Sequence, residues 1–166
     1  MRLEELFARH QAELCRYAAR FTGDRDLAED IVQDTFVRLA ERPPRDGTHV
    51  RAWLFRVVTT IAIDLQRADQ RRLRLVREEP SRGPMGAPPP DPQHEAERRD
   101  VQGRVHAALA ELGERERSVL LMWEEGFAHR EIAAAVGTTT GSVGTMIARS
   151  LEKLARQLDL DAEDAP

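Results

Sequence analysis

Residues 129–147 read HREIAAAVGTTTGSVGTMI, and their spacing is typical of a helix-turn-helix. Ala133 is small where two helices would cross closely, and Gly137 stands four residues later, where a chain leaving a helix needs a positive φ. Residues 138–140 are threonines, which can cap the next helix. In such a unit the second helix enters the DNA major groove with its N-terminal residues at the base edges. The apolar positions are Ile132, Val136 and Val143.

The second helix of this unit carries a long apolar stripe but few charges. Arg149 is the first charged residue after the turn, so the first three turns offer hydroxyl groups and glycines instead of cations. Gly144 inside this helix costs about 1 kcal/mol relative to alanine. An ordinary helical hairpin with a glycine cap is the alternative interpretation of the stretch. The stripe comprises Val143, Ile147, Leu151, Leu154 and Leu158.

The N-terminal part of the chain predicts three further amphipathic helices. The first ends at Gly23, and a capping box of Asp26 and Glu29 is expected to start the second. The third contains the β-branched run 57–63, which sits inside a longer 3.6-residue pattern and is therefore interpreted as helix. The predicted helices span residues 2–22, 26–41 and 50–75. The expected buried side of the third helix comprises Trp53, Leu54, Val57, Val58, Ile61, Leu65 and Ala68.

The composition changes abruptly between residues 80 and 92, which hold six prolines, two glycines and one charge of each sign. Such a segment neither continues a helix nor packs a core, so it predicts a linker. Helical periodicity resumes near Gln93, with a stripe of Val101, Val105, Leu109 and Leu112 and another of Val119, Leu120 and Trp123. We therefore expect an all-α protein of two small helical domains. The predicted units are a helical bundle over 1–79, a Pro-rich linker over 80–97, a helix-turn-helix domain over 98–158 and an acidic tail over 159–166.

The charge of the chain is unevenly distributed. Its 166 residues include 25 Lys and Arg against 29 Asp and Glu, a net charge of −4 that, taken alone, argues against nucleic acid as a partner. Residues 51–77, however, hold seven arginines and two aspartates. An arginine stripe suits a groove that follows a nucleic-acid backbone, whereas a merely solvated face, the alternative, normally mixes signs. Helical spacing places Arg56, Thr60, Ile63, Arg67 and Arg71 on one solvent face.

The patterns of several other protein classes are missing from the sequence. Cys15 is the single cysteine, and the five histidines show no metal-ligand spacing, so we expect no metal and no cofactor. GxSxG, Walker, HExxH and Cys-x-x-Cys motifs are also missing, and enzymatic activity is therefore not expected. The chain has no run of about 18 apolar residues and no signal pattern, which predicts a cytoplasmic protein without membrane insertion.

Taken together in chain order, these motifs resemble a bacterial extracytoplasmic-function (group four) sigma factor of the sigma-70 family. The resemblance rests on the block AEDIVQDTF at residues 28–36, a proline-bounded loop, Arg-Ala-Trp-Leu at 51–54, the arginine cluster and the helix-turn-helix. It covers about three quarters of the chain. It implies sigma region 2 in the first domain, region 4 in the second, and a promoter-specificity subunit of RNA polymerase that performs no chemistry itself.

The resemblance also implies specific binding residues. Asp30, Gln33 and Asp34 match the pattern that docks on the clamp helices of the largest polymerase subunit, and their i, i+3, i+4 spacing places these acceptors on one helix face. A purely solubilising role is the alternative for these residues, and a dimetal carboxylate site lacks the necessary Glu-x-x-His pairs. The residues implied in binding and melting the minus-ten element are Arg45, His49, Arg56, Thr60, Ile63, Arg67, Arg71 and Arg72.

The chain departs from the family pattern in both DNA-binding parts. Thr60 stands where the family often has asparagine, the loop after Pro43 has no aromatic residue, and the recognition helix lacks two basic positions. We therefore expect weaker binding to the DNA backbone or an unusual minus-thirty-five sequence. The residues expected at that element are Thr139, Thr140, Ser142, Thr145, Arg149 and Lys153.

The implied partners are core RNA polymerase, promoter DNA and an anti-sigma factor. Two other functions stay open on the residues alone. A helix-turn-helix regulator would bind duplex DNA without polymerase, usually as a dimer on paired half-sites. A pure adaptor would leave both basic faces merely solvated.

Overall fold

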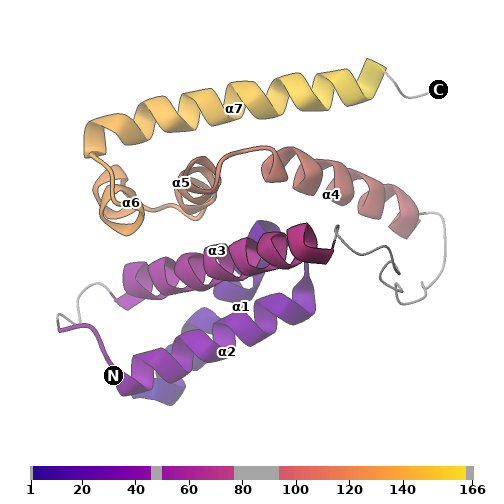
Figure 1. Ribbon diagram of the computed structural model, residues 1–166. Helices are drawn as coiled ribbons and strands as arrows, with labels where there is room; N and C mark the ends of the chain where they lie inside the picture. The colour runs from indigo at the N-terminus through magenta and orange to yellow at the C-terminus, as the bar shows by residue number, and fades with distance from the viewer. Residues whose placement is uncertain (1, 46–49, 77–93, 164–166) are drawn as a thin grey trace.

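The computed structural model describes residues 2–45, 50–76 and 94–163, and these residues form α-helices and connecting turns (Figure 1). Helices α1 to α3 form the first half of the molecule, and α4 to α7 form the second half beside it. The all-α prediction is thus confirmed for the described part of the chain. Residues 80–93 of the predicted linker over 80–97 lie outside it, and residues 94–97 form the first turn of a helix. The helices are α1 (Leu3–Thr22), α2 (Arg25–Glu41), α3 (Val50–Val76), α4 (His94–Ala110), α5 (Glu114–Glu124), α6 (His129–Val136) and α7 (Thr140–Glu163).

The sharp turn between α1 and α2 is built from a glycine and an aspartate. Gly23 ends α1 with φ of 78°, as the sequence predicts, and its amide donates to the Ala19 carbonyl at 2.8 Å. Asp24, not Asp26, caps α2, because its carboxylate accepts from the Leu27 amide at 3.0 Å. The predicted capping box was therefore placed two residues late.

Helix α3 is buried along its first half and exposed along its second. Leu54, Phe55 and Val58 are fully buried against α1 and α2, and the Tyr17 hydroxyl lies 2.7 Å from the Thr59 hydroxyl. Burial raises the pKa of Tyr17 well above its usual range. The expectation that Leu65 would be buried is wrong, since it is 39% exposed. Ala68, also expected inside, is exposed as well.

The helix-turn-helix expected at residues 129–147 is formed by α6 and α7. Gly137 closes α6 in the left-handed region, with φ of 68°. The hydroxyl of Thr139 accepts from the Ser142 amide at 3.3 Å, so a threonine caps α7 as predicted. Helix α7 continues to Glu163, into the acidic segment assigned to a tail.

The apolar stripes predicted for the second half are only partly buried. The interior includes Leu109, Leu112, Val119, Leu120, Val143 and Ile147. The exposed members of the predicted stripes are Val101, Val105, Trp123 and Leu151.

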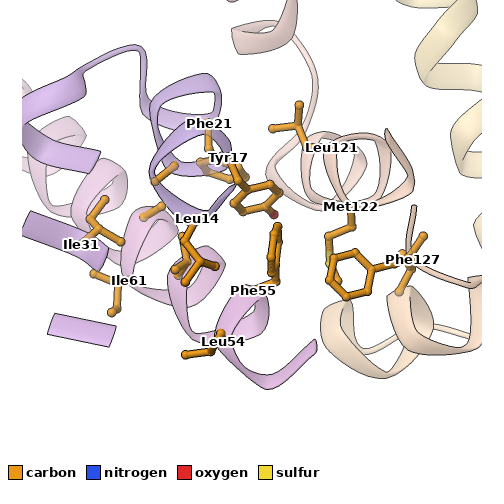
Figure 2. Packing of buried hydrophobic residues seen from close by; sticks show 14 of the residues in the cluster. Leu14, Tyr17, Phe21, Ile31, Leu54, Phe55, Ile61, Leu121, Met122 and Phe127 are labelled. Atoms are coloured by element: carbon orange, nitrogen blue, oxygen red, sulfur yellow. The ribbon is translucent and has the colours of Figure 1, made fainter. Parts of the chain in front are cut away.

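The two halves share one continuous hydrophobic core. Phe127, in the turn after α5, packs its ring edge-on against Phe55 of α3, with ring centroids 4.8 Å apart. Phe55 in turn contacts Tyr17 of α1 at 4.9 Å, so aromatic rings connect the interior of the first half with that of the second (Figure 2). The sequence did not predict this packing, because neither half reveals its partner by its own periodicity.

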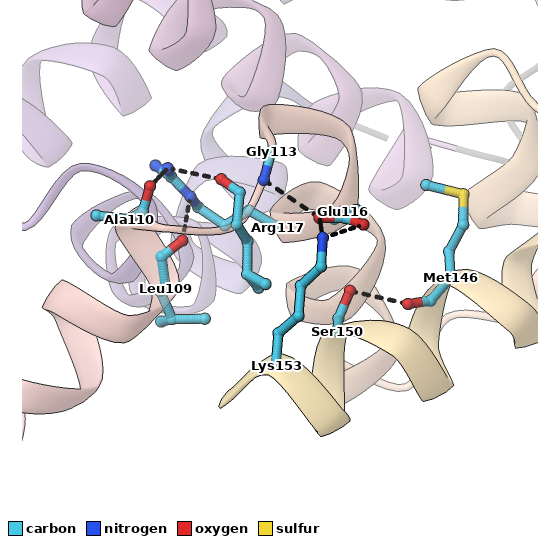
Figure 3. A network of polar contacts seen from close by, with 9 residues as sticks. Leu109, Ala110, Gly113, Glu116, Arg117, Met146, Ser150 and Lys153 are labelled. Carbon is cyan, nitrogen blue, oxygen red and sulfur yellow. Dashed lines mark hydrogen bonds and ion pairs between the residues drawn. The ribbon is translucent and has the colours of Figure 1, made fainter. Parts of the chain in front are cut away.

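A buried arginine completes the junction (Figure 3). Arg117 of α5 is only 6% exposed, and its guanidinium donates to the carbonyls of Leu109, at 2.9 Å, and Ala110, at 3.1 Å, at the end of α4. It also donates to the Phe21 carbonyl of α1 at 3.1 Å and to the Gln66 side chain of α3 at 3.2 Å. Burial lowers the pKa of Arg117. One side chain thus bonds α4, α1 and α3.

Two glycines should respond in opposite directions to alanine. Gly23→Ala places a Cβ at positive φ and against the His106 ring, so we expect a loss of about 1–2 kcal/mol in the free energy of unfolding. Gly144→Ala places a Cβ 3.7 Å from the His129 ring, an ordinary contact, and should gain up to about 1 kcal/mol. Urea unfolding of the two variants measures both changes. Equal effects would contradict this account of Gly23.

Candidate nucleic-acid interface

The solvent face predicted on α3 is present along the outer side of that helix. Arg56, Thr60 and Arg67 are exposed, whereas Ile63 is half-buried against the core. The Thr60 hydroxyl donates to the Arg56 carbonyl at 2.9 Å, which leaves its oxygen able to accept from a ligand. Arg71 and Arg72 are exposed further along the same helix. The structure therefore places the predicted α3 residues along one helix, and Ile63 is the least exposed of them.

The loop residues predicted beside this face are only partly described. Arg45 is exposed at the end of the loop after α2, and His49 lies outside the described residues. Pro44 and Trp53 line a hollow of about 420 Å³ together with Arg56 and with Arg130 of α6. The loop side of the face thus adjoins the second half of the molecule.

Arg67 is engaged within the protein. Its guanidinium donates to both carboxylate oxygens of Glu114 on α5, at 2.6–3.1 Å. The hydrogen bonds that Arg67 donates to Glu114 raise the pKa of Arg67. Arg67, which is predicted to contact DNA, is thus paired with a carboxylate of the second half in this structure.

The acidic motif of α2 lies on the opposite part of the first half. Asp30 and Gln33 are exposed, and Asp34 is half-buried with Arg38 at 3.0 Å. An open, largely apolar groove of about 570 Å³ runs beside Gln33. The surface thus offers carboxylate and amide acceptors next to apolar area. The groove is lined by Leu3, Glu4, Phe7, Gln33, Phe36, Val37, Ala40 and Glu41.

The first turns of α7 present hydroxyl groups. Thr139 and Ser142 hydrogen-bond to each other at 2.8 Å, and Thr140, Thr145 and Arg149 are exposed. Lys153, also predicted at DNA, binds both oxygens of Glu116 at 2.7–2.8 Å in the structure (Figure 3). The hydrogen bond from Lys153 lowers the pKa of Glu116.

Arg51 belongs to the arginine run of α3 but was not among the predicted binding residues. Its guanidinium carbon lies 4.2 Å above the Phe127 ring and 5.1 Å above the Phe55 ring. It donates to both oxygens of Glu13 at 3.0–3.3 Å and to the Glu125 carbonyl at 3.0 Å. Burial alone would raise the pKa of Glu13, but the bonds from Arg51 and His10 and the Arg51 charge lower it.

The described residues contain no group of three His, Cys, Asp or Glu that could hold a metal ion. None of the helices in this part of the chain is long and apolar enough to cross a membrane. Cys15 is half-buried. Burial, and to a smaller extent the charge of Glu29, raises the pKa of its thiol. A thiol of this kind is a poor nucleophile.

Two protein-family models match the chain, one in each half. The model described as Sigma-70 region 2 matches residues 6–72, and the model described as Sigma-70, region 4 matches residues 102–154. The first match covers the α1–α3 bundle and the second covers the helix-turn-helix.

Similar proteins agree with these matches. The sigma factor SigL of Mycobacterium tuberculosis is 32% identical over 145 residues, which are 85% of this chain and 80% of SigL. SigE of Mycolicibacterium smegmatis is 30% identical over 155 residues, 91% of this chain but 59% of SigE. The fold resembles that of RpoE from Bartonella quintana, solved with the anti-sigma factor NepR, with a TM-score of 0.71, 21% identity, and coverage of 95% and 97% of the two chains. The chain therefore belongs to the extracytoplasmic-function sigma factors of the sigma-70 family, non-enzymatic proteins that direct RNA polymerase to promoters.

Proposed function

We propose that the two halves of this sigma factor divide its work, with core polymerase and the minus-ten element bound by residues 1–79 and the minus-thirty-five element bound by residues 98–158. Residues 80–97 would connect them and 159–166 would form an acidic tail. The observation that carries this proposal is the basic face of α3, which combines exposed arginines with a hydroxyl in an acidic protein. We place the protein in the cytoplasm, where polymerase acts.

Core polymerase would bind along α2. The acceptors of Asp30, Gln33 and Asp34 share one helix face, and the apolar groove beside Gln33 extends the available contact area. Charge-assisted hydrogen bonds to a basic partner helix would be shorter and stronger than neutral ones. Leu3 and Val37, both large and exposed, would supply apolar contact at this surface.

The minus-ten element would lie along α3 as a melted single strand. Arg56, Arg67, Arg71 and Arg72, with Arg45 and His49 of the loop, would follow the backbone, and Thr60 and Ile63 would contact bases. Aromatic or apolar surface and cations together suit unstacked nucleotides. Extruding a base costs a few kcal/mol, which binding to the protein would offset.

The minus-thirty-five element would be read by the first turns of α7. Thr139, Thr140, Ser142 and Thr145 would face base edges and phosphates, and Arg149 and Lys153 would follow further along. Lys153 would first have to leave Glu116, an exchange of one ion pair for another. Because this helix has few cations, docking on polymerase would bring it to DNA.

An anti-sigma factor is the remaining proposed partner. RpoE of Bartonella quintana was solved in complex with NepR, and this chain shares its fold. We infer that a protein of that kind holds this sigma factor inactive.

Charge reversal on α2 tests the polymerase surface. Asp30→Lys with Asp34→Lys should abolish co-purification with core RNA polymerase and transcription from a promoter library, because like charges would then face a basic partner. Glu111→Lys with Glu152→Lys, exposed acids of the second half, is the matched control and should retain both activities. Unimpaired transcription by the first pair would refute this assignment, and duplex binding without polymerase would favour an independent regulator.

Loss of arginines on α3 should weaken promoter opening more than closed-complex binding. Arg71→Ala with Arg72→Ala is expected to slow opening about tenfold and to lower the salt slope of open-complex formation by about 2. Arg9→Ala with Arg16→Ala on α1 changes the charge equally and should have little effect. Fluorescence of 2-aminopurine in the minus-ten element reports opening, and gel shifts of a duplex fragment report binding. Equal losses in both assays would argue against a melting role.

A cation introduced into the recognition helix should strengthen its binding to DNA. Thr145 is exposed on α7. Thr145→Arg is expected to raise the salt slope of holoenzyme binding to duplex minus-thirty-five DNA by about 1. Glu111→Arg, remote from the helix-turn-helix, is the control. A slope unchanged by Thr145→Arg would place this position away from phosphates.

A further inference from the structure

A hollow of about 770 Å³ lies between α1, the start of α2 and α4. Its volume falls within the range of small-molecule sites in proteins. Within the described part of the chain, its lining includes none of the residues predicted to bind polymerase or promoter DNA. The polymerase and promoter surfaces therefore leave this hollow without a role.

One wall of the hollow is an apolar stripe on α4. Val101, Val105 and Leu109, which we call the α4 stripe, are spaced by four residues and so share one helix face over about 12 Å. Leu109 is buried, whereas Val101 and Val105 are 57% and 37% exposed. Cys15 and Ala19 of α1, both half-buried, also line the hollow. A stripe of this length favours a long, narrow apolar ligand over a single ring.

Arginines line the hollow near the turn between α1 and α2. Arg25, the first residue of α2, is exposed and makes no hydrogen bond or ion pair with another described residue. Arg16 and Arg20 of α1 also line the hollow, and Arg20 is paired with Glu124. Among the described lining residues, these three guanidinium groups stand against one carboxylate, that of Glu29. The lining therefore carries a net positive charge.

His106 of α4 lies at the same end of the hollow, because its ring contacts Gly23, two residues before Arg25. Its Nδ1 is buried and has no hydrogen-bond partner within the described residues. Nearly all buried polar atoms in proteins have a partner, so such an atom marks a place where water or a ligand is expected. Gly103 precedes His106 by three residues and shares its side of α4. A Cβ added at Gly103 would meet no atom within 4 Å, so this end of the hollow is open.

We propose that this hollow binds a fatty acid, a single-chain carboxylic acid whose carboxylate lies at Arg25 and whose chain lies along the α4 stripe. A guanidinium binds a carboxylate through two parallel hydrogen bonds, and the chain would remove the exposed valine surface from water. The acid would contact α1, α2 and α4 at once. The proposal does not depend on how the chain binds polymerase or promoter DNA.

Protection of Cys15 tests whether the hollow is filled. Cys15 is the single cysteine of the chain and lines the hollow, so its alkylation by N-ethylmaleimide reports access to this site. Decanoate at about ten times its Kd should slow the alkylation about tenfold, because only the unbound protein reacts. Acetate, which lacks the chain, and decyltrimethylammonium, which has the opposite charge, should give no protection.

An alkylation rate unchanged by decanoate would overturn the proposal. Equal protection by decyltrimethylammonium would overturn the assignment of the carboxylate to a cationic end. Protection by phosphatidylglycerol vesicles without protection by decanoate would overturn a free acid as the ligand, since the same chemistry would then come from a membrane lipid.

Charge reversal tests the position of the carboxylate. Arg25→Glu should weaken decanoate binding at least about tenfold in isothermal titration calorimetry, because two carboxylates would face each other. Glutamate suits the first turn of a helix, so α2 should be preserved. Arg115→Glu is the matched control, since Arg115 is also exposed in the first turn of a helix but does not line the hollow. Equal affinities of the two variants would refute the role of Arg25.

Filling the open end tests the location independently of charge. Gly103→Leu should abolish the calorimetric signal of decanoate, because the new side chain would occupy the open space, and leucine is a better helix former than glycine. Gly103→Ala adds only a Cβ and should retain binding. Decanoate binding to Gly103→Leu with the affinity of Gly103→Ala would place the acid outside this hollow and overturn the proposal.

Discussion

The edge-on packing of Phe127 against Phe55, with Arg51 above both rings, is the contact on which the relation of the two halves depends. Phe127 reaches this position because Gly126, at φ of 83°, turns the chain directly after α5. Burying a phenylalanine side chain contributes about 1.5–3 kcal/mol. Arg51 can lie on the rings without an unpaired charge because Glu13 accepts from it. Apolar packing, cation–π contact and a half-buried ion pair thus meet at one point between α3 and the α5–α6 turn.

The same point links the two proposed DNA-binding faces to each other. The α6–α7 unit adjoins α3 because the α5–α6 turn is seated there, and Glu114 of α5 pairs with Arg67. Movements of the two proposed faces relative to each other are therefore coupled through the junction. Such coupling acts in both directions, since whatever separates the halves at one face separates them at the other.

Much of the fold could be predicted from local signals. The ends of α1 and α6 were predicted because Gly23 and Gly137 follow apolar periods, and left-handed caps are a property of a few residues. The boundary of α2 was misplaced because Asp24 and Asp26 are both capping residues, and only the bond from Leu27 distinguishes them. The exposure of Leu65 was missed because periodicity shows which side of a helix faces inward but not how far its neighbours extend.

The candidate site was predictable as a set of residue types but not as a set of contacts. The arginines of α3 stood out as a charge run, whereas the pairing of Arg67 with Glu114 joins residues 47 positions apart. In the sequence, Arg117 is recognisable only as a charged residue next to the apolar run of α5. Its role could not be predicted, because its carbonyl partners come from other helices. Long-range contacts of this kind depend on packing, and no local period encodes them.

The aromatic junction also sets a thermodynamic condition on the working cycle. When the halves part, the rings of Phe55 and Phe127 lose each other's cover, and hydration of that surface raises the heat capacity of the open form. A chain with its halves apart would therefore expose apolar surface that a partner could cover. A complex that reburied these two rings would have a smaller heat-capacity change than the area of new contact alone would suggest.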